Sequence, residues 1–311
     1  MKKVKIGGQA VIEGVMMRNY DQYAVAIRKP DKTIEVKVEE CLPIGERVKF
    51  FKLPFVRGVF NFVESLVLGV RTLTYSAEFY EEEAEATLAD KVVDKVFKDK
   101  AESFMTFLTV LFAIVLAVGL FMLLPAFLVQ FLEKWVTNHI VLSILEGVLR
   151  LGIFLLYVVL ISQMEDIKRT FMYHGAEHKT INCLEAGVDL TPENVMQYSR
   201  FHKRCGTSFM FVVMVISILV FMLIDTESTL LRMVYRLLLI PVVASLSYEF
   251  IMLAGRSNSK VINALSAPGM WIQRLTTKEP DIYMAEVAIA SVEAVLDWRA
   301  YLQAMRNGEV R

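Results

Sequence analysis

Cysteine and histidine are scarce in this sequence, and neither sign of charge predominates. The three cysteines, Cys41, Cys183 and Cys205, are an odd number at irregular spacings, so they do not suggest a secreted disulfide framework. Reduced cysteines that face the cytosol fit this number and spacing better than disulfide bonds do. The 34 basic residues equal the 34 acidic residues, whereas a general nucleic-acid binder would carry a basic excess. The N-terminal MKKVKIGGQAV lacks the continuous apolar core of a signal peptide, so we expect no cleaved targeting segment.

Apolar residues, in contrast, are abundant. They make up 55% of the 311 residues and give a positive mean hydropathy, which predicts an integral α-helical membrane protein. A span needs roughly 20 mostly apolar residues. About four segments qualify within a predicted membrane domain, 103–254, although the third is short and the fourth contains Pro241, which we expect to kink it. These segments are 103–131, 140–162, 209–224 and 230–254.

Basic residues predict the orientation of these helices. The central loop, 163–208, is rich in Lys and Arg, and so is the stretch after the last span, whereas the loop after the first span offers only Lys134. Because cytoplasmic loops carry the excess of basic residues, we expect both termini and the 163–208 loop to be cytoplasmic. The lipid bilayer is then the predicted partner, beside a protein partner or a second copy of the chain, and no nucleic acid is expected.

The N-terminal residues 1–52 predict a small strand-rich cytosolic unit. Residues 23–40 show a period-two pattern on both sides of a Pro-Asp-Lys turn, which is typical of a β-hairpin. The preceding GGQAVIEGVMMR is compatible with a second strand pair. It matches no phosphate-binding or dinucleotide-binding motif, so we assign it no ligand and interpret Gly7 and Gly8 as residues that relieve tight turns.

Residues 53–102 predict an interfacial helix followed by a solvated amphipathic helix. In 53–75, a narrow polar stripe runs along an otherwise apolar helix, as expected at a membrane interface. A full span is disfavoured because it would bring charges into the bilayer. The acidic run that follows passes into a basic amphipathic segment with no implied partner. The stripe consists of Arg57, Asn61, Glu64 and Arg71.

The stretch YHGAEHKTIN contains the pattern H-x-x-E-H at His174, Glu177 and His178. Residues four apart share one face of a helix, so the two imidazoles could bind one zinc ion, while Glu177 acts as the general base of a hydrolase. Zinc needs at least a third protein ligand, and the chain offers His202 and Cys205.

Several alternatives stay open for this stretch. Glu185 and Glu249 are further candidates for the third ligand, and Gly175 weakens the helix that would carry the site. The histidines could also be ordinary polar residues without metal. A closed site of His174, His178, His202 and Cys205 would be structural and would catalyse nothing.

Charges also occur inside the predicted spans. Glu146 and Arg150 are four residues apart and can neutralise one another, so we interpret them as a structural pair. Glu249 has no evident local partner and could meet the Arg57 stripe, complete the metal site or reach the interface.

The motifs GGQAVIEGVMMR, FVESLVLGVR, YHGAEHKTIN, RFHKRCGTSF and GMWIQRLTTKEP, in this order, resemble those of the YqhQ-like family of bacterial multi-pass membrane proteins. The resemblance covers almost the whole chain. It implies a bacterial cytoplasmic membrane and a protein of unknown function that is predicted to depend on a metal, with ligands at His174, His178, His202 and Cys205 and with Glu177 beside them.

Residues 255–311 predict a cytosolic C-terminal tail in which 284–305 form one amphipathic helix that packs against the N-terminal unit or an interface. Two functions follow from the sequence. The first is a zinc-dependent hydrolase acting on a peptide or a lipid headgroup at the membrane surface. The second is a non-catalytic scaffold or regulatory protein. A transporter that uses the intramembrane charges is a weaker third hypothesis, because no internal repeat supports it.

Overall fold

The computed structural model describes residues 6–41, 53–80 and 101–309, except 225, 227 and 258. The predicted acidic and amphipathic run at 81–100 lies outside these residues. The chain forms two compact units. The first consists of Met1–Tyr80, Val158–Ile216 and Leu239–Arg311, and the second of Glu81–Tyr157 and Ser217–Leu238.

A four-stranded antiparallel sheet forms the centre of the first unit. The strands follow chain order, so each pairs with the next through a short turn, and both predicted strand pairs are confirmed. Gly7 and Gly8 lie within the first strand at ordinary φ angles, so the expectation that they relieve tight turns was wrong. The strands are β1 (Ile6–Val11), β2 (Gly14–Asn19), β3 (Gln22–Arg28) and β4 (Ile34–Glu40).

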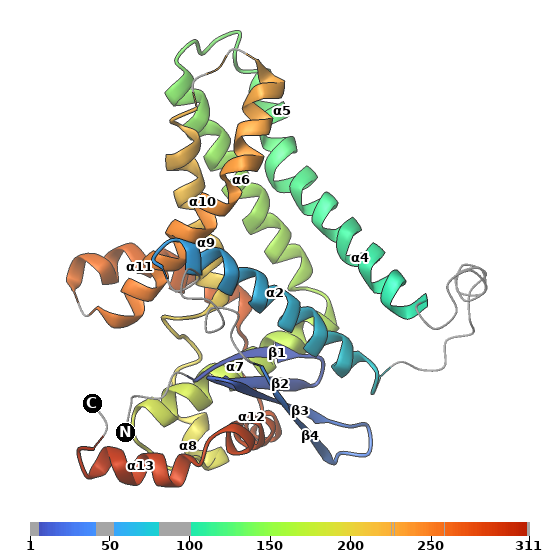
Figure 1. Ribbon diagram of the computed structural model, residues 1–311, viewed down its shortest axis with the longest axis vertical. Helices are drawn as coiled ribbons and strands as arrows, with labels where there is room; N and C mark the ends of the chain where they lie inside the picture. Colours follow the sequence, from blue (N-terminus) through green and yellow to red (C-terminus); the bar gives the residue numbers. More distant parts are fainter. Residues whose placement is uncertain are drawn as a thin grey trace. The chain divides into compact units, whose positions relative to one another are not determined.

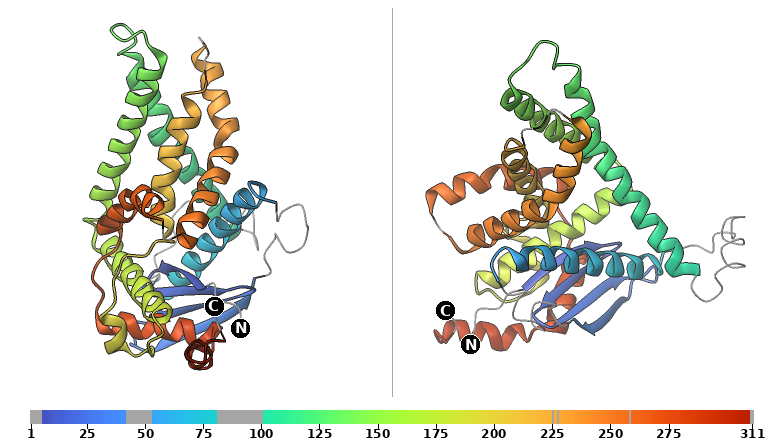
Figure 2. Two further views of the ribbon diagram at one scale, coloured as in Figure 1. Left: turned by 90° about the vertical axis from the view of Figure 1, so that its left-hand side faces the viewer. Right: turned by 45° about the horizontal axis from the view of Figure 1, so that its top comes forward.

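Alternation along β3 gives the sheet two buried faces. Ala24 and Ala26 face a core shared with α7 (Glu165–Glu185) and α12 (Ile282–Val295). Val25 and Ile27 face the opposite side, against α2 (Val56–Ala77). Because successive strand side chains point to opposite faces, one strand contributes to both layers. Figures 1 and 2 show α2 on one face of the sheet and α7 and α12 on the other.

Each residue of the polar stripe of α2 forms a hydrogen bond or an ion pair with another part of the first unit. Glu249, whose role was open in the sequence, pairs with Arg57, with the Arg57 Nε atom 2.8 Å from the Glu249 Oε1 atom. The opposite face exposes apolar side chains, as expected of an interfacial helix. The other stripe contacts join Asn61 to Tyr248, Glu64 to Arg18 and Arg71 to Glu39.

The predicted single helix at 284–305 was wrong. Two helices, α12 and α13 (Trp298–Arg306), are separated at Leu296, whose backbone is extended. Asp297 begins α13, because its carboxylate accepts a hydrogen bond from the backbone N–H of Ala300. The predicted packing of α12 against the N-terminal sheet is confirmed through β2 and β3.

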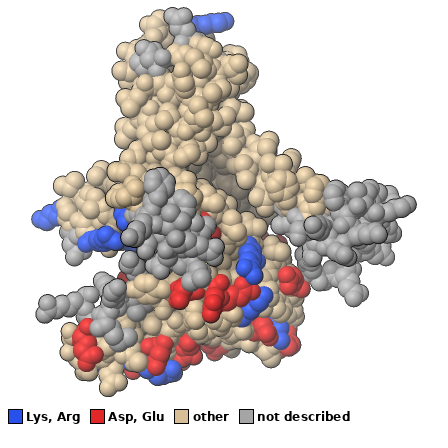
Figure 3. Space-filling model, in the orientation of Figure 1, with Lys and Arg blue, Asp and Glu red and all other residues tan. Residues whose placement is uncertain are grey.

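Within the described part of the chain, three helices are long and apolar enough to cross a membrane: Phe107–Gln130, Ile140–Ile161 and Leu230–Arg256. The predicted third span at 209–224 is instead the 16-residue helix α9 (Gly206–Phe221), which is shorter than a span. Figure 3 shows a largely uncharged surface over the helices of the second unit. The three long apolar helices are built from these elements: the first from α4 (Ala101–Val118), the π-helical turn Gly119–Leu123 and α5 (Leu124–Gln130), the second from α6 (His139–Ile161) and the third from α10 (Thr229–Arg256).

Two further helices complete the first unit. The short α8 (Pro192–Met196) lies in the predicted central loop and is capped by Thr191. The amphipathic α11 (Lys260–Thr276) ends beside α7 and carries buried Gln273 on its inner face. The predicted C-terminal tail is therefore largely helical.

Candidate metal centre

Helix α7 presents the H-x-x-E-H residues in the predicted way. Glu165 and Asp166 stand in its first turn, where acidic side chains favour a helix start. The spacing then brings His174, Glu177 and His178 to one side of the helix. Glu177 is 4% exposed and His178 is 1% exposed, so neither is an ordinary solvated polar residue.

Backbone carbonyls fix the tautomers of both histidines. The His178 Nδ1 atom lies 2.6 Å from the Arg200 carbonyl oxygen, and the His174 Nδ1 atom lies 2.9 Å from that of Thr276. A carbonyl oxygen only accepts, so each Nδ1 carries the hydrogen and donates it. An imidazole whose one hydrogen is on Nδ1 keeps the lone pair of its Nε2 atom for a ligand, which is the arrangement typical of metal-binding histidines.

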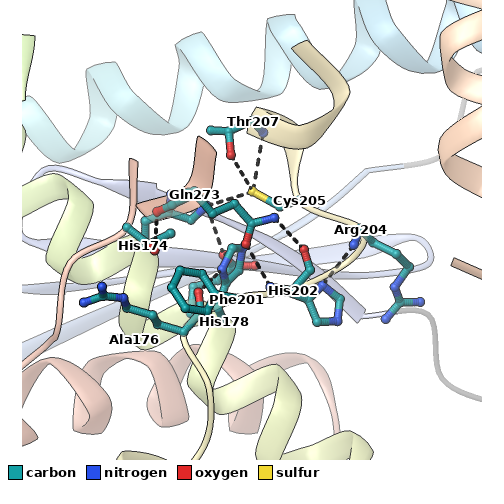
Figure 4. A network of polar contacts seen from close by, with 12 residues as sticks. His174, Ala176, His178, Phe201, His202, Arg204, Cys205, Thr207 and Gln273 are labelled. Atoms are coloured by element: carbon teal, nitrogen blue, oxygen red, sulfur yellow. Dashed lines mark hydrogen bonds and ion pairs between the residues drawn. The ribbon is translucent and has the colours of Figure 1, made fainter. Parts of the chain in front are cut away.

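Cys205 supplies a third ligand atom to this pair. Its Sγ atom is 3.3 Å from the His174 Nε2 atom, and the three ligand atoms lie within 4.8 Å of one another. Tetrahedral zinc with ordinary Zn–N and Zn–S bonds separates its ligand atoms by about 3.5 Å. Figure 4 shows Cys205 and Thr207 beside the histidines. The group of His174, His178 and Cys205 could therefore hold a metal ion.

Cys205 lies at the start of α9. The residue directly precedes this helix, and the Thr207 backbone N–H donates to Sγ across 3.4 Å. A thiolate is the form of cysteine that binds zinc.

Glu177 stands beside the three ligands. Its Oε2 atom is 3.6 Å from the His178 Nε2 atom and 3.9 Å from the His174 Nε2 atom. Burial raises the pKa of the Glu177 carboxyl, an effect that the neighbouring His174 opposes. Burial also lowers the pKa of His178 and so favours its neutral, metal-binding form.

His202 lies near this group but is bonded elsewhere. Its Nε2 atom is 3.4 Å from a Glu185 carboxylate oxygen, and its Nδ1 atom accepts from the Arg204 backbone N–H. Glu185 also pairs with Arg204, while Glu249 pairs with Arg57. Of the candidates for a third ligand, the structure brings Cys205 to the two histidines.

Gln273 is a supporting residue that the sequence reasoning missed. It is 0% exposed and bridges α11 to the loop before α9. Its side-chain NH₂ donates to the His202 carbonyl and to the Ser208 hydroxyl, and its Oε1 atom accepts from the His202 backbone N–H. These bonds fix the loop that carries Cys205. The only signal in the sequence was a polar residue on the buried face of an amphipathic segment.

The role of two glycines, Gly8 and Gly175, was misjudged from the sequence, because both permit a close approach of neighbouring segments. A Cβ atom on Gly8 would lie 2.7 Å from the Met16 carbonyl oxygen and 2.8 Å from the Glu177 Cγ atom. A Cβ atom on Gly175 would lie 2.1 Å from the Lys278 carbonyl oxygen. Gly175 therefore lets the chain next to Thr276 approach α7, although the sequence suggested that it only weakens the helix.

Changing Gly8 to Ala is expected to displace Glu177 and to cost about 1–3 kcal/mol of stability, because the clash with a strand carbonyl cannot be relieved by a rotamer change. Thermal unfolding of the purified protein measures this loss. Gly7→Ala is the matched control, since a Cβ atom there meets nothing within 4 Å. Equal stability of the two variants would contradict the role assigned to Gly8.

Comparisons with known proteins agree with the resemblance noted in the sequence. Residues 53–298 match the family model described as "Protein of unknown function (DUF1385)". The chain is 34% identical over 298 residues to the uncharacterized protein YqhQ of Bacillus subtilis, covering 93% of this chain and 92% of that protein. No solved structure matches the chain. The chain therefore belongs to the DUF1385 family of proteins of unknown function.

Proposed function

We propose that this protein is a zinc-dependent hydrolase that acts on the cytosolic side of the bacterial cytoplasmic membrane. One observation carries the proposal: two carbonyl-fixed histidines turn their Nε2 atoms toward Cys205, with a buried carboxylate beside them. Imidazole and thiolate ligands together suit zinc better than magnesium or calcium, which prefer oxygen.

The number of ligands supports catalysis over a purely structural metal. Catalytic zinc sites keep three protein ligands and one open position, whereas structural sites are closed by four. His202, the fourth member of a closed site, is bonded to Glu185 and to the Arg204 backbone. Zinc bound here would lower the pKa of a water molecule and polarise the bond to be cleaved.

Glu177 is the proposed general base. Its carboxylate lies beside both histidine Nε2 atoms, within reach of a water that occupies the open position. Burial raises the pKa of this carboxylate and makes it a stronger base, which can take a proton from the attacking water and return it to the leaving group. The Gly8 backbone N–H donates to the same carboxylate and helps to orient it.

The neighbouring elements support a substrate at the membrane surface. Cys205 directly precedes α9, an apolar helix, and α2 exposes Val63, Leu66 and Val67 on its outer face. Apolar side chains on an interfacial helix favour contact with the headgroup region. A lipid headgroup and a membrane-bound peptide both fit this placement.

The test of the hydrolase is Glu177→Gln in bacteria that depend on the protein. The amide keeps the shape of the side chain but cannot take a proton, so we expect function to fall by at least about 100-fold with bound metal retained. Complementation together with metal content measures both effects. Glu165→Gln, on the exposed first turn of the same helix, is the control. Full complementation by Glu177→Gln would favour the scaffold hypothesis.

A further inference from the structure

A buried cluster of charges lies in the second unit, far in sequence from the metal ligands. Glu146 and Arg150 pair across one turn of α6, with the Arg150 Nη2 atom 2.7 Å from the Glu146 Oε1 atom. The pairing expected from the sequence is thus present. Arg236 of α10 is a third member that the sequence reasoning missed, and its Nη2 atom is 2.6 Å from the Glu146 Oε2 atom.

Among the residues that the structure describes, this cluster carries one more positive charge than negative charge. Two guanidinium groups share a single carboxylate, and Arg150 and Arg236 are only 6% and 3% exposed. The Nε atoms of both arginines lack a hydrogen-bond partner in the part of the chain that the structure describes. The Phe221 ring lies 5.2 Å from the Arg150 guanidinium and 5.5 Å from that of Arg236. These cation–π contacts offset part of the free-energy cost of burying the two positive charges. A buried charge without a counter-charge remains expensive in an apolar helix bundle.

A small cavity lies against this excess charge. It has a volume of about 40 Å³, which exceeds the roughly 10–15 Å³ that one water needs. Glu146, Arg236 and the hydroxyl-bearing Ser143 form its polar wall, and Val129 and Leu142 contribute to its apolar wall. Arg232 and Glu133 also line it and pair with each other at 3.4 Å.

The depth and size of the cavity limit its occupant. Arg236 comes seven residues after Thr229, where α10 begins, which places its backbone about 10 Å along the helix. A phosphate group bound at the start of α10 would lie that far from Arg236, whereas a small ion fits the cavity. The net charge of the three clustered side chains requires one negative charge.

We infer that this cavity binds one small monovalent anion of the halide class beside Arg236. The anion supplies the negative charge that the cluster lacks and accepts hydrogen bonds from the guanidinium and from Ser143. The proposal does not depend on the metal site, because all residues that carry it belong to the second unit.

Thermal unfolding of the full-length protein in detergent tests the inference. Chloride or bromide is added to halide-free gluconate buffer at constant ionic strength. We expect a saturable rise in Tm of about 2–6 °C, since a ligand that binds only the folded state stabilises it. A flat titration would overturn the proposal. Stabilisation by phosphate alone, or by phosphatidylglycerol vesicles alone, would also overturn it and would assign the site to a phosphate group.

Two variants should change the halide-induced rise in Tm in opposite directions. Arg236→Gln leaves Glu146 paired with Arg150 and makes the cluster neutral, so the halide effect should disappear. Glu146→Gln leaves both arginines uncompensated, so its Tm should fall in gluconate and rise more with halide than that of the wild type. A halide effect that persists in Arg236→Gln, or that is lost in Glu146→Gln with folding retained, would contradict the site.

Discussion

His178→Ala should abolish the metal binding that we propose for this protein. His178 offers one of the three ligand atoms that the described residues bring together, and its Nδ1–H is bonded to the Arg200 carbonyl. Loss of a residue that only supports a ligand costs 10–100-fold in affinity, so loss of the ligand itself should cost at least about 100-fold. Competition with a chromophoric chelator measures the change.

His202→Gln is the matched control for this prediction. The sequence places His202 among the ligands, whereas the structure joins its ring to Glu185 and to the Arg204 backbone. We expect His202→Gln to keep its metal within about threefold of the wild-type affinity. Equal losses in the two variants would show that His202 is a ligand and that the three-ligand centre is incorrect.

Gly175→Ala should have the second large effect, because it should lower both the stability of the protein and its affinity for metal. In an exposed helix this change stabilises by about 1 kcal/mol. Here the added carbon would lie 2.1 Å from the Lys278 carbonyl oxygen, and a backbone oxygen cannot rotate away. Overpacking of this kind costs about 1–3 kcal/mol and outweighs the gain in helix propensity. Because the displaced segment includes Thr276, the hydrogen bond that orients His174 should weaken as well.

Thermal unfolding and chelator competition together measure the Gly175→Ala effect. Gly152→Ala on α6 is the control, since a Cβ atom there meets nothing within 4 Å, and it should leave both quantities unchanged or slightly improved. A Gly175→Ala protein as stable as the wild type, with its metal affinity intact, would contradict the close approach of the 276–280 segment to α7.

Local patterns in the sequence predicted most of the fold. The period-two pattern on both sides of a Pro-Asp-Lys turn predicted the hairpin of β3 and β4, and long, mostly apolar segments predicted the three spans. Where two signals competed, the prediction was wrong. Helical spacing continued through Leu296, but the Asp297 cap ended one helix and began another. The third span was predicted to reach residue 224, but α9 ends at Phe221 and has only 16 residues.

Long-range contacts in the candidate site could not be read from the sequence. The spacing of His174, Glu177 and His178 is local and predicted one helical face. The carbonyl of Thr276, the amide of Gln273 and the space beside Gly8 come from segments about 70 to 170 residues away, and no periodicity links them. Arg236 was missed for the same reason, because it meets Glu146 only through packing of α10 against α6.

Zinc content and zinc-edge X-ray absorption of the detergent-purified wild-type protein test the central claim most directly. The account predicts about one zinc per chain, with one sulfur ligand at about 2.3 Å and nitrogen ligands at about 2.0–2.1 Å. Protein that is folded but free of metal under conditions that do not strip it, or zinc without a sulfur ligand, would contradict the centre formed by His174, His178 and Cys205.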